Sequence, residues 1–350
     1  MNQKIGLEVH VELDTNTKLF CGCARSGSEE PNSRTCPTCL GMPGSKPVIN
    51  SKVIDFALKL CLALKCKISS KLVFSRKVYF YPDLAKNYQV TQYEEPLGKN
   101  GKLVLPNNNF VGISRVHIEE DPASLIHDIG VSNYVLVDYN RSGNPLLEIV
   151  TEPMIESAED ARDFMRQLIN VLKYLGIFNT NTCIINADVN VSIKESGFTR
   201  VEVKNITGFK DIERVINHEI DRQRSSKVVK ETRGWDSEKG VTYSMRTKES
   251  EEDYGYIIEP NLVPIKIDKS KVAKIKKDIP ELGMSRISKF IKDYKIDKED
   301  AKVISMELEL AELFEKVAKK IDPKLAAKWM RKELLRVLNY NKIQIDQIRI

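Results

Sequence analysis

The sequence lacks any run of about 18 uninterrupted apolar residues, the length that a helix needs to cross a bilayer, and this absence excludes a spanning helix. Its first residues, MNQKIGLEVHVEL, alternate apolar and polar side chains and contain no apolar signal-peptide core. We therefore expect a cytoplasmic location. The chain has 350 residues, of which 41% are hydrophobic and 30% charged, and this composition predicts a globular protein of about two domains.

Several catalytic signatures are also missing. The sequence contains neither G-x-x-x-x-G-K-[ST] nor G-x-G-x-x-G, so a bound nucleotide would not be held by the folds that use those loops. It has no G-x-S-x-G elbow, and its two Ser-Ser-Lys triplets, at 69–71 and 225–227, lack the glycine-rich surroundings that expose a serine nucleophile. We therefore expect no serine hydrolase chemistry in this chain.

Charge is unevenly distributed along the chain. The net charge is +6, yet residues 265–350 hold 22 Lys and Arg against 14 Asp and Glu, while residues 1–264 hold 33 against 35. Strand patterns dominate residues 1–264 and helical patterns dominate residues 265–350. We predict an α+β protein, with a β-rich domain at 1–264 and a basic helical domain at 265–350. The basic domain suggests an anionic partner, although a lysine-rich solvated surface gives the same balance.

Helical periodicity is clearest in three segments of the β-rich part. Ser51 to Cys66 has apolar residues at helical spacing. A second helix is expected to start at Ser157, with Asp160 placed as in a capping box, and to stop at Gly176. A third is expected after Gly208.

The strands place unusual polar residues on one face. Period-2 alternation sets these residues opposite apolar partners: Glu8, His10 and Glu12 in 5–13; Arg115, His117, Glu119 and Asp121 in 115–121; Asn186, Asp188, Asn190 and Ser192 in 183–193; Arg200, Glu202 and Lys204 around Val201 and Val203. The alternation does not fix the direction of Glu120. Any one such strand fits an ordinary solvated sheet face. Together they favour a site for hard cations and phosphates.

Four of the seven cysteines crowd into residues 21–39. Cys21 and Cys23 form one close pair and Cys36 and Cys39 a second, separated by a short loop with turn-forming residues. This spacing predicts a structural tetrathiolate zinc site. Two disulfides are the alternative, and a reducing compartment disfavours them. We expect a closed site that stabilises the fold and takes no part in catalysis.

Residues 74–92 mix basic and aromatic side chains. Arg76, Lys77 and Lys86 alternate with Tyr79, Phe80, Tyr81 and Tyr88, and Asp83 lies among them. Such interleaving suits phosphate contact combined with base stacking on single-stranded nucleic acid. An ordinary aromatic strand would have a similar composition.

Several long motifs stand out in the sequence: IGLEVHVEL (5–13), KLFCGC (18–23), RKVYFYPDLAKNYQVTQ (76–92), RVHIEEDPAS (115–124), VDYNRSGNPLLEIVTEP (137–153), KNITGF (204–209) and EEDYGYIIEPNLVP (251–264). Together they resemble the B-subunit family of aspartyl/glutamyl-tRNA amidotransferases (the GatB family). The resemblance runs in order across residues 1–264, and the helices that follow are similar to the family's helical domain.

The resemblance implies a reaction in steps. ATP phosphorylates the side-chain carboxylate of a misacylated Glu-tRNA(Gln) or Asp-tRNA(Asn), and ammonia then displaces the phosphate. A partner amidase, the A-subunit, makes the ammonia from glutamine, and a small C-subunit completes a heterotrimer. The family's N-terminal fold is a largely antiparallel β cradle resembling glutamine synthetase.

Matching the motifs residue by residue gives candidate sites. The resemblance assigns magnesium to Glu8, His10, Glu119 and Glu148, with Glu12, Glu120 and Asp188 as second choices, and adds Lys204 to the catalytic set. Lys77, Arg115 and Lys204 would orient phosphates. The candidates for tRNA or phosphate contact are Arg76, Lys77, Tyr79, Tyr81, Asp83, Gln89 and Arg115. His10 is an unusual magnesium ligand, and its alternative role is to orient a carboxylate through a hydrogen bond.

One departure and two rival interpretations stand beside this assignment. Many family members continue into a small tail domain implicated in tRNA binding, whereas this sequence ends at QIDQIRI (344–350), which leaves full tRNA affinity open. A zinc-stabilised RNA-binding module without catalysis is the rival from another class. The archaeal paralogous subunit carries a large inserted domain, for which the stretch from Lys230 to Pro264 leaves no room.

Overall fold

The computed structural model describes residues 2–126, 134–247, 254–343 and 345. The chain divides into two compact units: the first comprises Met1–Gln167 and Ile177–Asp278, and the second comprises Leu168–Gly176 and Ile279–Ile350. The first is built around β-sheet and the second is helical, so the fold class is α+β as predicted. Within the described residues, no helix is long and apolar enough to cross a membrane.

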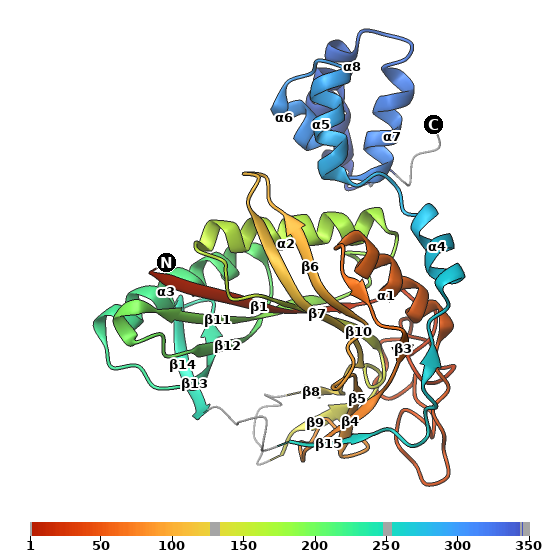
Figure 1. Ribbon diagram of the computed structural model, residues 1–350, viewed down its shortest axis with the longest axis vertical. Helices are drawn as coiled ribbons and strands as arrows, with labels where there is room; N and C mark the ends of the chain where they lie inside the picture. The colour runs from red at the N-terminus through yellow and green to blue at the C-terminus, as the bar shows by residue number, and fades with distance from the viewer. Residues whose placement is uncertain (1, 127–133, 248–253, 344, 346–350) are drawn as a thin grey trace. The chain divides into compact units, whose positions relative to one another are not determined.

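A nine-stranded sheet forms the centre of the first unit (Figure 1). Its strand order is β14-β13-β12-β11-β1-β10-β7-β6-β2, and all neighbours are antiparallel except β12 and β13. The strands are β1 (Gln3–Glu12), β2 (Lys67–Ile68), β6 (Gly98–Val104), β7 (Phe110–Glu120), β10 (Pro145–Thr151), β11 (Ile185–Ile193), β12 (Val201–Ile206), β13 (Glu231–Asp236) and β14 (Val241–Thr247).

Three short sheets accompany the large one. β15 (Gly255–Ile258), β4 (Ser75–Val78) and β5 (Tyr88–Thr91) form the first; β16 (Ile265–Lys266) with β3 (Lys71–Leu72) and β8 (Ser124–Ile126) with β9 (Leu136–Asp138) form the others. Figure 1 shows β4, β5, β8, β9 and β15 on the side of the large sheet away from α1 and α2. The first unit therefore has the open, largely antiparallel β architecture that the resemblance implied.

Three helices begin where the sequence predicted them: α1 (Ser51–Ala63), α2 (Ala158–Tyr174), whose last turns belong to the second unit, and α3 (Phe209–Ser225). The first unit also has α4 (Lys269–Lys277) and a short 3-10 turn, η1 (Lys194–Ser196). Ser157 caps α2 by accepting the backbone N–H of Asp160 at 3.0 Å, and Gly176 ends the segment with a φ of +61°. Asn50 caps α1 in the same way, through the N–H of Lys52.

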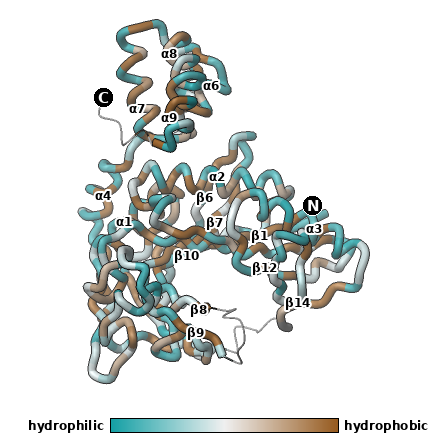
Figure 2. Tube along the Cα trace, turned by 180° about the vertical axis from the view of Figure 1, so that it is seen from behind, coloured by the Kyte–Doolittle hydropathy of each residue, from teal (hydrophilic) through white to brown (hydrophobic). Residues whose placement is uncertain are grey.

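The apolar face of the sheet forms the core of the first unit. Ile5, Leu7, Val9 and Val11 of β1 are at most 1% exposed, and α3 packs against β11 and β12. Figure 2 shows hydrophobic residues along the central strands around β1, β7 and β10. Because successive residues of a strand point to opposite faces, this burial directs Glu8 and His10 to the other side.

The second unit is a small helical bundle. Its helices are α5 (Gly283–Asp293), α6 (Lys298–Ile304), α7 (Leu308–Val317), α8 (Pro323–Trp329) and α9 (Leu335–Asn341), with one π-helical turn, η3 (Met330–Leu334), joining the last two. Phe290, Phe314 and Met330 are among its buried core residues. The hydroxyl of Tyr174 donates to the carbonyl of Ser305 at 3.1 Å, which fixes residues 168–176 in this unit.

Candidate active site and metal centre

A row of polar side chains crosses the middle of the large sheet. The register pairs His10 of β1 with Asn186 of β11 on one side and with Glu148 of β10 on the other, and Glu148 faces His117 of β7. Glu8 lies directly opposite Asp188. The alternation read from separate strands therefore brings these residues together on one face.

The first cluster on this face contains His10, Glu119 and Glu148. Nε2 of His10 lies 3.5 Å from an oxygen of each carboxylate, and Nε2 of His117 lies 3.1 Å from Glu148. Thr91 of β5 donates its hydroxyl to Glu119 at 3.2 Å. The side chain of His10 is 24% exposed, whereas those of Glu119, Glu148 and His117 are largely buried.

Burial and charge compete in this cluster. Burial lowers the pKa of His10, but the hydrogen bond to Glu148 and the charges of Glu119 and Glu148 outweigh it and raise the pKa to about 10. Burial likewise acts against the charged form of His117, yet Glu148 and Glu119 raise its pKa to about 9. Burial acts to raise the pKa of Glu148, while His117 and His10 hold it well below its usual range.

A second cluster lies beside the first, formed by Glu8, Asp188 and Glu202. Their ligand oxygens lie within 4.8 Å of one another. The ammonium of Lys204 donates a hydrogen bond to the carboxylate of Asp188, and it lies 3.2 Å from an oxygen of Glu202. Burial raises the pKa of Glu8, and the nearby charge of Glu148 adds to the effect. Burial lowers the pKa of Lys204, but Asp188 and Glu202 raise it more strongly.

The donor sets fit divalent cations. In the first cluster the imidazole and both carboxylates bring ligand atoms within 4.8 Å of one another, and the second offers three carboxylates at the same spacing. Magnesium takes oxygen ligands at about 2.1 Å in an octahedron, so either set would contract around an ion, and in the second set the ion would displace the Lys204 ammonium. Such an arrangement can hold a cation against phosphate oxygens.

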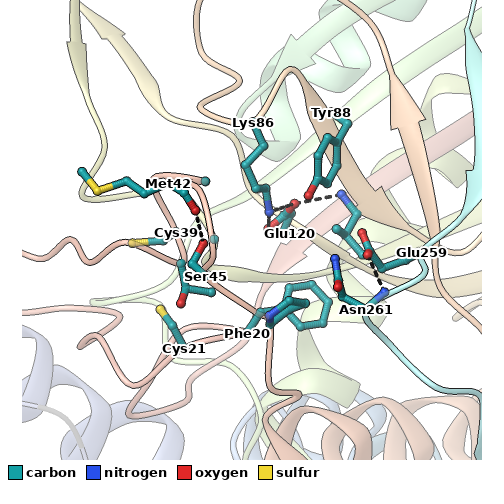
Figure 3. Close-up of a pocket in the computed structure, with 15 residues that line it drawn as sticks. Phe20, Cys21, Cys39, Met42, Ser45, Lys86, Tyr88, Glu120, Glu259 and Asn261 are labelled. Atoms are coloured by element: carbon teal, nitrogen blue, oxygen red, sulfur yellow. Dashed lines mark hydrogen bonds and ion pairs between the residues drawn. The ribbon is translucent and has the colours of Figure 1, made fainter.

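Glu12 and Glu120 do not join these clusters. Glu12 accepts hydrogen bonds from Asn144 at 2.6 Å and Arg25 at 3.4 Å, so it is occupied at the end of β1. Glu120 points away from its neighbour Glu119 and accepts two hydrogen bonds from Lys86, at 2.6 and 2.7 Å. This pair lies in a pocket of about 80 Å³. Cys21 and Cys39 also line the pocket (Figure 3).

The basic and aromatic segment is tied to β15 across about 180 residues of sequence. Arg76 makes two hydrogen bonds to Glu259, at 2.6 and 2.9 Å, and its guanidinium lies 4.3 Å from the Tyr88 ring centroid. The ammonium of Lys77 lies 4.6 Å from the ring centroid of Tyr254. Several side chains of the segment thus already have protein partners.

The remaining candidates of this region differ in exposure. Tyr81 is 48% exposed and the Arg115 side chain 45% exposed, so both are accessible to a ligand. Tyr79 lies edge-on to Tyr254, and burial raises its pKa, with Asp83 and Glu119 acting in the same direction. The amide of Gln89 donates to the backbone carbonyl of Glu120 at 2.7 Å. The pKa of Asp83 is raised by burial, which the charge of Arg141 partly offsets.

The four cysteines form a compact cluster able to bind a metal such as zinc. Their sulfur atoms lie within 4.8 Å of one another, and those of Cys36 and Cys39 are 3.9 Å apart. Four sulfurs at about 2.3 Å from a tetrahedral zinc would be about 3.8 Å apart, which this spacing matches. All the cysteines are free thiols. A hydrogen bond from Cys21 lowers the pKa of Cys39 to about 5 despite its burial, and Lys18 acts in the same direction.

Two residues of the polar face were not among our predicted site residues. Glu202 belongs to the second cluster and His117 touches both carboxylates of the first. Both lie on the polar side of the predicted alternation, so the strand pattern already marked them as candidates for the site. What the sequence does not give is the strand order, which decides which polar residues become neighbours.

The comparisons with known proteins agree with this architecture. The family described as "GatB/GatE catalytic domain" matches residues 3–273. The chain is 44% identical over 352 residues to a protein of Carboxydothermus hydrogenoformans named as the B-subunit of aspartyl/glutamyl-tRNA(Asn/Gln) amidotransferase, and the match covers 96% of this chain and 73% of that protein. It is 46% identical over 357 residues to the protein of the same name from Methanosarcina acetivorans, covering 98% and 72%. The namesake from Saccharolobus solfataricus is 44% identical over 360 residues, covering 98% and 76%.

These matches extend over almost the whole chain, including the strands that carry both acidic clusters. The fold and the site define an α+β protein whose large sheet carries a carboxylate-rich face. The chain belongs to the GatB/GatE family.

Proposed function

We propose that this chain is the tRNA-binding, ATP-using subunit of an aminoacyl-tRNA amidotransferase. In this proposal ATP phosphorylates the side-chain carboxylate of Glu-tRNA(Gln), Asp-tRNA(Asn) or both. Ammonia then attacks the acyl phosphate, forming the amide and releasing phosphate. The observation that carries the proposal is the pair of adjacent acidic clusters on one sheet face, in a chain of this family.

The residues of the face have complementary tasks in this reaction. Glu119, Glu148 and His10 would hold one magnesium ion, and Glu8 and Asp188 lie where a second could bind. Magnesium would offset the negative charge that accumulates when a carboxylate attacks ATP. Lys204 would orient a phosphate oxygen, because its ammonium lies at the edge of the second cluster. His117 would hold Glu148 in position through their 3.1 Å contact.

The tRNA would approach this face with its aminoacyl end. Tyr81 and Arg115 are accessible for stacking and phosphate contact, whereas the guanidinium of Arg76 is engaged by Glu259. The basic helical unit would add phosphate contacts farther along the tRNA. The ammonia would come from a partner amidase, the A-subunit, and a small C-subunit would complete the complex. The support for these partners is that the relatives are named as the B-subunit of an amidotransferase.

We also propose that the four clustered cysteines bind one structural zinc ion. Zinc would occupy all four sulfur ligands, which leaves no open position for a substrate. The centre would stabilise residues 21–39 against unfolding, and the chemical step would take place on the sheet face.

Co-purification and activity test the whole proposal. The chain, co-expressed with an amidase partner, should be isolated as a complex that converts misacylated tRNA to the amidated product in the presence of ATP and glutamine. Both Glu-tRNA(Gln) and Asp-tRNA(Asn) should be assayed, because the name of the relatives includes both. tRNA binding without tRNA-dependent ATP turnover in the complex would favour the non-catalytic RNA-binding module instead.

A further inference from the structure

Lys18 is a fully buried lysine beside the cysteine cluster. Its relative exposure is 0%, and its ammonium contacts two groups: Sγ of Cys39 at 3.8 Å and the backbone carbonyl of Tyr139 at 3.2 Å. Among the ion pairs of the described residues, none joins Lys18 to a carboxylate. No described carboxylate therefore lies close enough to this ammonium to pair with it directly.

The surrounding chain holds Lys18 in this position. The backbone N–H of Lys18 donates to the carbonyl of Cys23 at 3.0 Å, and the N–H of Leu19 donates to the carbonyl of Gly143 at 2.9 Å. Gly143 has a φ of +83°, and a Cβ built there would lie 3.5 Å from Cys39 and 3.7 Å from the Lys18 stem. Lysine, cysteine and loop are thus packed together.

The buried ammonium favours a negative charge on the cysteine cluster. Burial of an ammonium is strongly unfavourable unless an opposite charge accompanies it. Four thiols or two disulfides are neutral and would leave Lys18 with only a carbonyl dipole. Four thiolates around a divalent zinc ion carry a net charge of −2. Cys39 already accepts the N–H of Cys36 at 3.1 Å, so it is suited to be the thiolate that meets the lysine.

We propose that Lys18 is the charge-balancing residue of a tetrathiolate metal centre, with its ammonium donating to the Cys39 thiolate. The inference rests on the zinc site proposed above and adds a residue outside the four ligands. Lys18 positions and stabilises the thiolate without binding the metal. Hydrogen-bonding partners of metal ligands commonly change metal affinity by about 10- to 100-fold.

The test compares Lys18→Met with a matched variant, Lys46→Met, in the full chain. Both remove one ammonium, but Lys46 is exposed and lies in the same segment. Zinc affinity is measured by competition with a chromophoric chelator at fixed pH and salt. Lys18→Met should bind zinc about 10- to 100-fold more weakly than the wild type, and Lys46→Met should match the wild type. Equal affinity in all three proteins would overturn the role of Lys18.

A second variant keeps the test decisive if Lys18→Met does not fold. Cys23 is only partly buried, so a larger histidine side chain can be placed there. Because histidine binds zinc as a neutral ligand, Cys23→His reduces the negative charge of the centre by one. Removing Lys18 should then cost less zinc affinity than in the background with all four cysteines, and Lys18→Met should be recovered as a folded protein there. An equal cost in both backgrounds, or no recovery while Cys23→His alone folds, contradicts the proposal. If the wild type binds no zinc, the zinc site itself fails.

Discussion

His10 and Glu148 face each other directly across β1 and β10, with Nε2 of His10 3.5 Å from a Glu148 oxygen. Nε2 of His117, on β7, lies 3.1 Å from the same carboxylate. Two imidazoles thus hold one carboxylate in place on a sheet, where strand geometry leaves little freedom. Because the backbone ladder fixes the three residues, the site is organised before any ligand arrives.

The carboxylate of Glu119 should be required for ATP chemistry. Glu119→Gln keeps the shape and the contact with Thr91 but removes the charge that would hold a cation. We expect tRNA-dependent ATP turnover in the assembled complex to fall at least about 100-fold, while the Kd for tRNA changes little. Glutamine hydrolysis by the amidase should persist, uncoupled from product.

The matched control for this prediction is Glu152→Gln, the same change at an exposed residue just after β10. It should leave turnover unaffected. Near-normal turnover in Glu119→Gln would remove this carboxylate from the proposed site, and a comparable loss in both variants would indicate a nonspecific effect on folding.

Zinc should be present in stoichiometric amount and should act through stability. Elemental analysis of protein purified without chelators should give one zinc per chain. Removing it should lower the unfolding midpoint, because metal binding contributes directly to the folding of such sites. Cys36→Ser should have the same effect, and Cys183→Ser, at a cysteine outside the cluster, should retain the metal. Protein that is fully folded and zinc-free would contradict this prediction.

The polar face shows how far the sequence could be interpreted. Burial of one side of a strand fixes the direction of the other side, so alternation alone placed Glu8 with His10, and Glu119 with His117, on the polar face of each strand. Which of them meet depends on the order β12-β11-β1-β10-β7, which joins strands distant in the sequence. The pairing of β11 with β12 also has a register shift between Ala187 and Val189, which counting every second residue does not predict.

Other features depended on contacts that no local pattern contains. The cysteine cluster was predictable because its ligands lie within 19 residues of one another. By contrast, Arg76 pairs with Glu259 through the β4–β15 contact, and Glu120 pairs with Lys86. The guanidinium of Arg76, a predicted candidate for phosphate contact, is paired with a buried carboxylate, and this partner lies too far away in the sequence for any local pattern to indicate it.

The Arg76–Glu259 pair should therefore contribute to stability in a pH-dependent way. Burial acts to raise the pKa of Glu259, but the hydrogen bonds from Arg76 lower it below its ordinary value. A lowered carboxyl pKa stabilises the fold above the ordinary pKa of 4.5, and this contribution is lost as the pH falls through the folded-state value. Arg76→Met should cost about 2 kcal/mol at pH 7, because it leaves Glu259 buried without its partner.

Urea denaturation at pH 7 and at pH 3.5 measures this difference. The cost of Arg76→Met should shrink at the lower pH, where Glu259 can be protonated. Arg115→Met, which removes an exposed arginine, should change stability little at either pH. A cost for Arg76→Met that is the same at both pH values would show that lost packing against Tyr88, not the ion pair, is responsible.

The basic helical unit should contribute to tRNA affinity through phosphate contacts. Lys324, Lys328 and Lys332 are exposed along α8 and η3, at helical spacing. Each lysine that neutralises a phosphate releases a counterion, so affinity should fall steeply with salt. Replacing all three by Gln should weaken tRNA binding and make the plot of log Kd against log salt shallower, by about one unit for each lost contact.

Replacing three exposed lysines of the first unit, Lys67, Lys227 and Lys230, removes the same charge without touching α8 and should leave the slope unchanged. Equal slopes for both triple variants and the wild type would mean that the positive charge of the helical unit lies outside the tRNA interface.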